Sequence, residues 1–216
     1  TNSTEGRPDS VIEAMDTFWN TFFNGSGTDE WRLRGNALDE AIRTTAPRRT
    51  MELGTYCGYT AVRIGRLLPP GARLISVEIE PLFAAIASTV VEHAGLRDTV
   101  SVEIGSVEER LPAIHRKHGK EPLDALLLDH AVGEFLPDLR LLEQSGLIQK
   151  STKVLCDWNL YPGSEQDEQA PRHSQEFMRY LETRKASSSG GKELRTVRHS
   201  LRNKEVFTVS SWAGVV

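Results

Sequence analysis

The stretch Glu52-Leu53-Gly54-Thr55-Tyr56-Cys57-Gly58-Tyr59-Thr60 turns an apolar strand into a helix through two glycines. The residues before it, Thr50 to Leu53, are strand-like, and those from Thr60 to Leu68 have the apolar spacing of a helix. Gly54 and Gly58 can adopt positive φ without a Cβ penalty, so the backbone can come close to a ligand at the N-terminus of the helix. Such a turn at the carboxyl end of a strand indicates a site for a nucleotide-like ligand.

Glu78 lies at the end of the next predicted strand, Ala72 to Ile79. It follows the glycine turn by roughly 20 residues, which is the offset at which an acid meets a ribose diol in dinucleotide-binding folds. This spacing favours a nucleoside ligand. The glycine spacing is not G-x-G-x-x-G, and an acid at a strand end is usually just solvated, so the motif alone does not identify the ligand.

Length and composition favour one intracellular α/β domain over residues 1–216. The formal charge of −4 gives no basic surface for nucleic acid, and no apolar run is long enough to span a bilayer. The segment Thr1 to Asp9 lacks the regions of a signal peptide. Cys57 and Cys156 lie far apart and are interpreted as reduced thiols. We therefore expect a cytoplasmic monomer without nucleic-acid or membrane partners.

Strands and helices alternate along the chain. Two amphipathic helices, at residues 10–23 and 31–45, come first. The predicted strands are 50–53, 72–79, 99–104, 123–129 and 152–157, and the helices between them are 60–68, 81–93, 107–118 and 135–145. A helix at 174–185 and an antiparallel hairpin of segments 193–200 and 205–212 close the chain. The pattern predicts an α/β fold with a mostly parallel seven-stranded sheet and helices on both faces.

Four motifs carry a resemblance to a known family. They are the run Glu52 to Arg63, Leu67-Leu68-Pro69-Pro70-Gly71-Ala72-Arg73-Leu74, Leu127-Leu128-Asp129-His130, and Phe135-Leu136-Pro137-Asp138. In this order the chain resembles the catechol O-methyltransferases, which are class I S-adenosylmethionine-dependent methyltransferases. The resemblance implies a Rossmann-like fold in which the helices at residues 10–45 cover the site, and transfer of a methyl group to a small aromatic or phenolic acceptor.

The resemblance also implies a set of residues that contact S-adenosylmethionine. Glu78 would grip the ribose and Ile79 would pack on the adenine, which Gly105 and Ser106 would border. Asp129 and His130 would face the cofactor too. The methionine end would be lined by Glu52, Gly54, Tyr56, Gly58, Tyr59 and Thr60. After Ser106 the family has Ser-Gln where this chain has Val107-Glu108, so the adenine contacts are altered.

The match is weaker at the reaction centre. Family members hold magnesium with two aspartates and an asparagine that directly follows the second, because a hard cation takes oxygen ligands. Asp129 and Asp157 match the aspartates, but Trp158 stands at the asparagine position. Asn159 comes one residue later, and a shift by one residue points a strand side chain to the other face unless the backbone bulges. Asp129, Asp157 and Asn159 are therefore candidate magnesium ligands, although they do not form the complete motif of the family.

The catalytic base of the family is also missing. Val132 stands where the resemblance places a lysine, and Ala131 replaces an aromatic wall. His130 has a suitable ordinary pKa for a base, although in the family pattern it faces the cofactor. Asp129 and Asp157 could instead be helix caps or loop anchors.

Two functions stay open from the sequence. One is a methyltransferase with an altered acceptor, in which Asp129, Asp157 and His130 take part in catalysis, since transfer mainly needs alignment of acceptor, methyl and sulfur. The other is a cofactor-binding pseudoenzyme, or an enzyme recruited to another reaction, that no longer transfers methyl. The largely complete cofactor motif favours the first.

Overall fold

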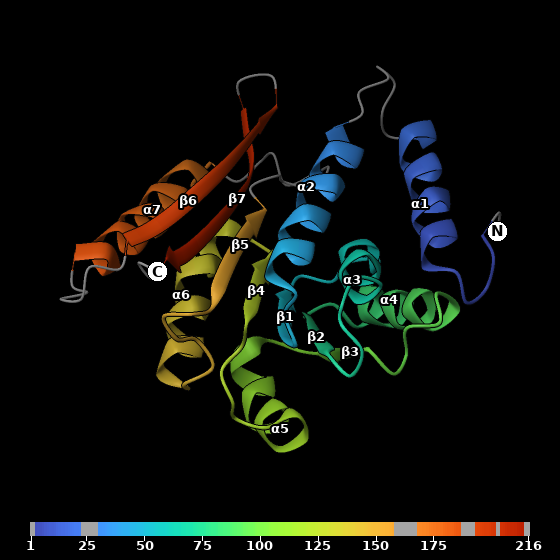
Figure 1. The fold of residues 1–216 in the computed structure, drawn as a ribbon, viewed down its shortest axis with the longest axis horizontal. Coiled ribbons are helices and arrows are strands. Elements are labelled where there is room, and N and C mark those ends of the chain that lie inside the picture. Colours follow the sequence, from blue (N-terminus) through green and yellow to red (C-terminus); the bar gives the residue numbers. More distant parts are fainter. Residues whose placement is uncertain (1–2, 23–29, 158–167, 187–192, 202–203, 214–216) are drawn as a thin grey trace. The chain divides into compact units, whose positions relative to one another are not determined.

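The computed structural model describes residues 3–22, 30–157, 168–186, 193–201 and 204–213 (Figure 1). The chain divides into two compact units, Thr1–Ser106 and Val107–Val216. Within the described part of the chain, no helix is both long enough and apolar enough to cross a membrane.

The first unit contains a parallel sheet of three strands with helices packed around it. The strands lie in the order β3-β2-β1, and both neighbouring pairs are parallel. Its elements are α1 (Pro8–Phe22), α2 (Glu30–Thr45), β1 (Arg49–Leu53), α3 (Tyr59–Gly65), β2 (Arg73–Glu78), α4 (Pro81–His93) and β3 (Val100–Ile104). Helices α1, α2 and α4 all contact α3, so this short helix is surrounded.

Helix α3 ends at Gly65, earlier than the predicted end at Leu68. The N–H of Leu67 bonds to the carbonyl of Ile64 at 2.9 Å, which tightens the chain into a turn. Pro69 then disfavours a helical conformation for the residue before it. The apolar spacing continues through Leu68, but the two prolines decide where the helix stops.

A buried arginine joins α2 to α3. Arg63 of α3 bonds both carboxylate oxygens of Asp39 in α2, with Nε to Oδ1 at 3.0 Å and Nη2 to Oδ2 at 2.9 Å. Gly35 lies beside this pair, and a Cβ there would come 2.2 Å from Nη1 of Arg63. The glycine inside α2, costly in a helix, is therefore explained by the space that the guanidinium takes.

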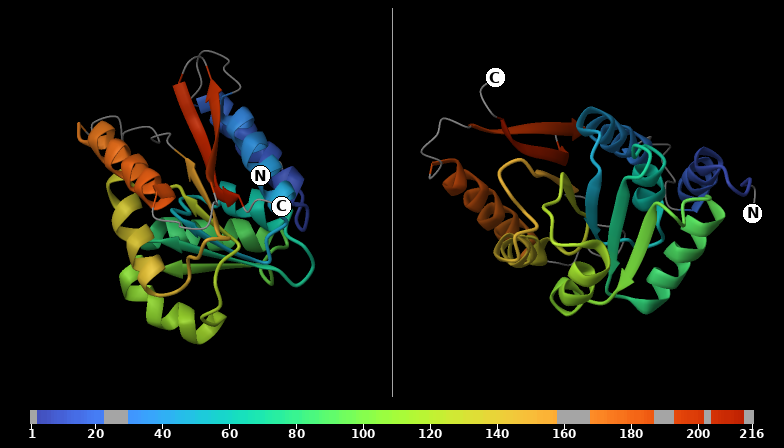
Figure 2. Two further views of the ribbon diagram at one scale, coloured as in Figure 1. Left: turned by 60° about the vertical axis from the view of Figure 1, so that its left-hand side comes forward. Right: turned by 60° about the horizontal axis from the view of Figure 1, so that its bottom comes forward.

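The second unit contains two parallel strands followed by two antiparallel ones. The strand order is β4-β5-β7-β6, in which β4 and β5 are parallel and β7 pairs antiparallel with both neighbours. Its elements are α5 (Val107–His118), β4 (Ala125–Leu128), α6 (Val132–Gln144), β5 (Lys153–Asp157), α7 (Ala170–Ala186), β6 (Glu193–Leu201) and β7 (Lys204–Ala213). Helix α7 packs on α6 and lies beside β6 (Figure 2).

Two helices of this unit begin earlier than predicted. Helix α6 begins at Val132 rather than Phe135, with the N–H of Glu134 bonded to the carbonyl of Ala131 at 2.9 Å. Gly133 has a low helix propensity and hides this start in the sequence. Helix α7 begins at Ala170 rather than Ser174, because Pro171 at its second position needs no helical hydrogen bond there.

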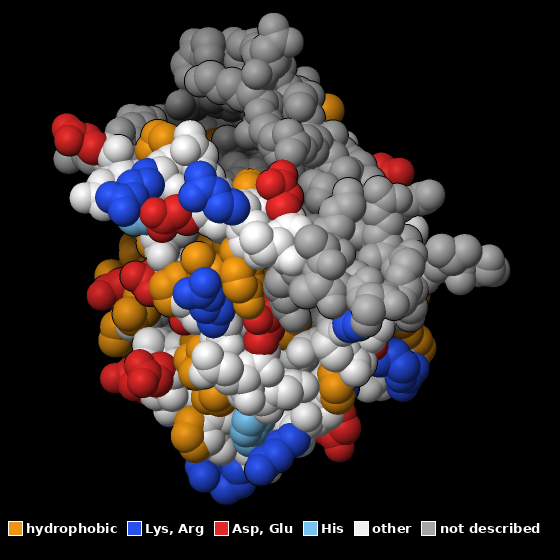
Figure 3. Space-filling model, turned by 90° about the vertical axis from the view of Figure 1, so that its left-hand side faces the viewer, with side chains coloured by type: hydrophobic (Ala, Val, Ile, Leu, Met, Phe, Trp, Pro, Cys, Tyr) orange, Lys and Arg blue, Asp and Glu red, His pale blue; other side chains and the backbone are white. Residues whose placement is uncertain are grey.

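Charged side chains of both signs lie on the surface of the described residues. Arg172 and Glu176, one turn apart on α7, form an exposed ion pair with Nε and Oε1 3.0 Å apart. On the face drawn in Figure 3, Lys and Arg side chains are interspersed with Asp and Glu side chains over the described residues.

Gly35→Ala tests the packing of Arg63 against α2. Replacing an interior helical glycine by alanine normally adds up to about 1 kcal/mol of stability. Here we expect a loss of about 1–3 kcal/mol, because the new Cβ displaces a buried guanidinium from its carboxylate. Urea denaturation measures the difference, with the exposed α2 substitution Glu40→Ala as the control. A stabilised Gly35→Ala protein would contradict the packing of Arg63.

Candidate functional site

The turn after β1 has an unusual backbone. Gly54 and Gly58 have φ of 93° and 86°, and between them Tyr56 has φ of 46° although it carries a side chain. The N–H of Gly58 closes the turn on the carbonyl of Thr55 at 2.9 Å, and α3 starts at the next residue. A strained residue between two left-handed glycines is typical of a loop that binds a ligand with its backbone.

The carboxylate of Glu78 holds this turn in place. Its Oε2 accepts hydrogen bonds from the N–H groups of Thr55 at 3.1 Å and Tyr56 at 2.8 Å. Its Oε1 accepts from the N–H of Glu80 at 2.9 Å. The residue is only 8% exposed, so these main-chain donors replace water around a buried charge. Glu78 is therefore not a solvated acid at a strand end.

A buried chain of polar groups runs beneath the turn. The register of β1 and β2 places Glu52 opposite Ser76, and the Ser76 hydroxyl donates to Oε2 of Glu52. The Thr55 hydroxyl lies 2.5 Å from that of Ser76. These hydrogen bonds were not predicted from the sequence. The available signal was a polar residue at paired positions of two largely apolar strands.

Glu52 has an unsatisfied buried oxygen. Burial raises the pKa of Glu52 to about 7, against hydrogen bonds from Ser76 and the Thr60 hydroxyl that lower it. Its Oε1 is buried and makes no full hydrogen bond within the described residues. A cationic group of a ligand would satisfy this oxygen and favour the ionised carboxylate.

Apolar side chains are exposed beside the acid. Ile79 and Ile104, at the ends of β2 and β3, are 67% and 49% exposed. Gly105 follows with φ of 129° and bonds its N–H to the carbonyl of Glu78 at 2.8 Å. The ring of Tyr56 contacts that of Phe83 in α4 at an interplanar angle of 51°, with centroids 4.4 Å apart. Exposed apolar side chains beside a carboxylate suit a ring system that carries hydroxyl groups.

Tyr59 and Thr60 form the first turn of α3, but the Tyr59 side chain does not point to the glycine turn. Its hydroxyl donates to Oδ1 of Asp16 in α1 at 2.7 Å and accepts from Nη1 of Arg63 at 2.6 Å. A ligand contact of Tyr59 would therefore come from its main chain, where the start of a helix leaves N–H groups available. The sequence gives no sign that the main chain and the side chain of Tyr59 have different partners.

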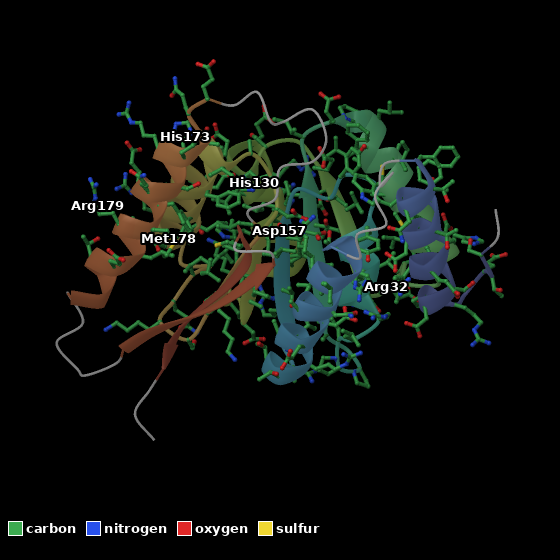
Figure 4. The ribbon with its side chains drawn as sticks, turned by 90° about the horizontal axis from the view of Figure 1, so that it is seen from above. Arg32, His130, Asp157, His173, Met178 and Arg179 are labelled. Carbon is green, nitrogen blue, oxygen red and sulfur yellow. The ribbon has the colours of Figure 1, made fainter. Side chains whose placement is uncertain are left out.

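Most of the remaining predicted site residues belong to the second unit. His130, just after β4, bonds through Nε2 to Oδ2 of Asp138 in α6 at 3.0 Å, while its Nδ1 is buried without a partner in the described structure. Asp157 is the last residue of β5, and Asp129 follows β4 directly. Figure 4 shows His130 and Asp157 at these strand ends. Ser106 ends the first unit, and Asn159 lies outside the described residues.

The second unit offers few metal donors. Its two predicted carboxylates supply the oxygen chemistry that a hard cation takes. Among the described residues, however, no group of three or more His, Cys, Asp or Glu side chains is arranged to hold a metal ion. The donors that are described therefore fit magnesium only in part.

The helix start at Val132 shapes the neighbourhood of His130. The Val132 side chain is buried at the first position of α6, and Ala131 before it is exposed. His173 of α7 packs against the next residue, with Nδ1 3.1 Å from where a Cβ of Gly133 would lie (Figure 4). Asp138 was named in the sequence as part of a motif, but its bond to His130 was not predicted. His173 was missed, because only the packing of α7 on α6 brings that residue here.

Glu52→Gln tests the buried carboxyl. Its pKa of about 7 in the folded state exceeds the ordinary value of 4.5. Between pH 4.5 and about pH 7, the folded protein therefore binds more protons than the unfolded chain. The free energy of unfolding should therefore fall as pH rises through this window, by up to about 1.4 kcal/mol per pH unit. Glu52→Gln should flatten that slope in denaturation curves, and the exposed control Glu92→Gln should keep it. If the free energy of unfolding had the same pH dependence in wild type and Glu52→Gln, the raised pKa of Glu52 would be contradicted.

Comparison with known proteins agrees with this geometry. The family model described as O-methyltransferase matches residues 30–185, more than half of the chain. The chain is 42% identical over 164 residues to the catechol O-methyltransferase of Mus musculus, covering 74% of this chain and 59% of that protein. It is 41% identical over 167 residues to catechol O-methyltransferase B of Danio rerio, covering 75% and 61%. The chain thus spans about three fifths of the length of these relatives.

Solved structures show the same fold. An O-methyltransferase from Bacillus cereus, in complex with SAH, superposes with a TM-score of 0.71 at 20% identity, covering 95% of this chain and 91% of that one. This likeness confirms the predicted Rossmann-like α/β fold class. The family model and the two relatives show that the chain belongs to the O-methyltransferase family, close to the catechol O-methyltransferases.

Proposed function

We propose that this protein is an S-adenosylmethionine-dependent O-methyltransferase, similar to catechol O-methyltransferase, that acts on a small aromatic or phenolic acceptor in an altered active site. The observation that carries the proposal is the glycine turn held by Glu78, with the unsatisfied oxygen of Glu52 beneath it. This arrangement offers a carboxylate, exposed apolar surface and helix N–H groups on one side of the first unit.

The described residues fit the parts of S-adenosylmethionine. The cofactor, when bound, supplies an activated methyl group on a sulfonium. Glu78 retains acceptor capacity for ribose hydroxyls, since a carboxylate can accept about four hydrogen bonds and three are used within the chain. Exposed Ile79 and Ile104 suit the adenine ring, and Oε1 of Glu52 suits the ammonium of the methionine end. These roles are part of the proposal.

The family likeness supports one continuous sheet. We propose that the three parallel strands of the first unit and the four strands of the second belong to a single seven-stranded sheet, as in a class I methyltransferase. Helices α1 and α2, which pack on α3 next to the glycine turn, would then cover the cofactor site.

The reaction centre would differ from that of catechol O-methyltransferase. Val132 is a buried apolar residue and supplies no proton acceptor, while His130 already bonds to Asp138. Asp129 and Asp157 offer two carboxylates, and a hard cation wants about six oxygen ligands. We therefore propose that magnesium binds weakly or only together with the acceptor, and that the acceptor is more acidic or a softer nucleophile than catechol.

One observation favours the rival function. The only nitrogen of His130 that has no partner among the described residues, Nδ1, is buried from solvent, so the histidine is not an evident base. A cofactor-binding protein without transfer activity would need no base. The unsatisfied Oε1 of Glu52 supports cofactor binding under either function. Transfer remains the better proposal, because the family model and the similar relatives are O-methyltransferases.

Glu78→Gln tests the cofactor site. We expect S-adenosylhomocysteine to bind at least about tenfold more weakly to this variant, a loss of about 1.4 kcal/mol, because the amide keeps the size of the acid but loses charge and acceptor sites. Isothermal titration calorimetry measures the affinity, and Glu92→Gln serves as the control in the same unit. Unchanged affinity in Glu78→Gln would count against the proposed site.

A labelled-methyl assay tests the acceptor. Wild-type protein should be poor on catechol, with or without magnesium, and better on more acidic phenols or thiols. Val132→Lys combined with Trp158→Asn should raise catechol methylation, because it supplies the base and the metal donor of the relatives.

The control for that assay moves the lysine by half a turn. Glu134→Lys with Trp158→Asn places the same charge at an exposed position and should not raise catechol methylation. Efficient methylation of catechol by wild type would refute the altered acceptor. Tight cofactor binding with no transfer by any variant would favour the pseudoenzyme.

A further inference from the structure

Helix α3 presents one polar face to both N-terminal helices. Tyr59 and Arg63 of this seven-residue helix, and Arg66 at its C-cap, follow at helical spacing and therefore lie on the same side. Its apolar residues Ala61, Val62 and Ile64 are buried in the core. The polar face therefore makes the specific contacts to α1 and α2, while the apolar residues fix α3 on the sheet.

Tyr59 connects the start of α3 to α1. Its hydroxyl donates to Asp16 at 2.7 Å and accepts from Arg63 at 2.6 Å, and all three side chains are buried. Burial raises the pKa of Tyr59 beyond its ordinary value, so the hydroxyl keeps its proton and remains a donor at all ordinary pH values. A charge-assisted bond of this kind is stronger than one between neutral groups.

Arg63 and Arg66 complete the connection through Asp39. Both guanidinium groups bond the Asp39 carboxylate of α2, and Arg66 also reaches Asp9 of α1 with Nε 2.8 Å from Oδ1. Burial alone would raise the pKa of Asp39, but the hydrogen bonds from Arg66 and Arg63 outweigh it and hold the pKa below its ordinary value. The ionised carboxylate is thus paired twice, as a buried charge requires.

The same short helix begins at the glycine turn. Gly58 is the N-cap of α3 in the left-handed conformation, and Tyr59 is the first helical residue. Its main chain belongs to the turn, while its side chain is bonded to α1. A shift of the turn therefore moves the hydroxyl relative to Asp16, and a shift of α1 pulls on the first residue after the turn.

We propose that Tyr59 is a positioning residue for cofactor binding: its bond to Asp16 couples occupation of the glycine turn to the docking of α1. The inference rests on the proposed cofactor site. Coupling of this kind is reciprocal, so a ligand in the turn should stabilise α1, and a firmly docked α1 should tighten the ligand. An ordinary structural bond would add stability without linking the two.

The test combines calorimetry with hydrogen exchange of α1. S-adenosylhomocysteine is the probe, and both measurements are made on wild type, Tyr59→Phe, Asp16→Ala and Asp16→Asn. In wild type, the ligand should slow amide exchange in α1. Tyr59→Phe and Asp16→Ala should each weaken binding roughly three- to tenfold, the range expected for one lost hydrogen bond, and remove the ligand-dependent protection.

Two further variants separate positioning from general stability. Asp16→Asn keeps an oxygen that accepts the tyrosine hydroxyl, so it should bind the probe nearly as well as wild type. Tyr180→Phe removes another tyrosine hydroxyl, which donates to Glu143 at 2.5 Å in the second unit, and should leave probe affinity unchanged. The double variant of Tyr59→Phe with Asp16→Ala should lose little more than either alone, because both act on one bond.

The outcomes distinguish this inference from the proposed function. If wild type does not bind the probe, the proposed cofactor site is wrong. If wild type binds it, but Tyr59→Phe and Asp16→Ala bind equally well or α1 exchange ignores the ligand, the coupling is wrong and the cofactor site stands. Should Tyr59→Phe fail to fold, Asp16→Ala decides, since it leaves the Tyr59–Arg63 bond intact.

Discussion

The carboxylate of Glu78 is the constraint on which the site depends. The five residues 54–58 between β1 and α3 leave main-chain N–H groups that must be satisfied. This single buried acid accepts from Thr55 and Tyr56 of that turn, and from Glu80 after β2. This turn also determines where α3 begins, and therefore where the polar face with Tyr59 and Arg63 lies. The strained conformation of Tyr56 persists because these bonds and the ring contact with Phe83 hold the residue in place.

The first unit contains two buried carboxyl groups whose pKa values are changed in opposite directions. Asp39 is paired with two arginines, and its low pKa keeps it ionised in the folded protein. Glu52 has only hydroxyl partners, and burial raises its pKa to about 7. The first acid serves the structure, because its charge is already matched within the chain. The second is unmatched without a ligand, which is why the electrostatics of the unit indicate Glu52 rather than Asp39 as a binding group.

Much of the fold could be predicted from the sequence, because apolar periodicity and turn residues determine most elements. The α/β class and helix α4 were predicted correctly, the latter to the residue. Errors arose where proline or glycine changes a helix end, at Pro69, Gly133 and Pro171. The glycine turn and Glu78 were found as a motif, but the hydrogen bonds of Glu78 to the turn were not. The hydroxyl of Tyr59 bonds across helices, and no local pattern in the sequence reports such a contact.

Because Arg63 lies close to Gly35, the residues tolerated at these two positions depend on each other, although the positions are far apart in the chain. While the arginine is present, any side chain at position 35 collides with it. Once the arginine is replaced by a smaller residue, the glycine is no longer required, and alanine there becomes favourable for the helix. The two substitutions are therefore epistatic, and the effect of a side chain at position 35 depends on which residue occupies position 63.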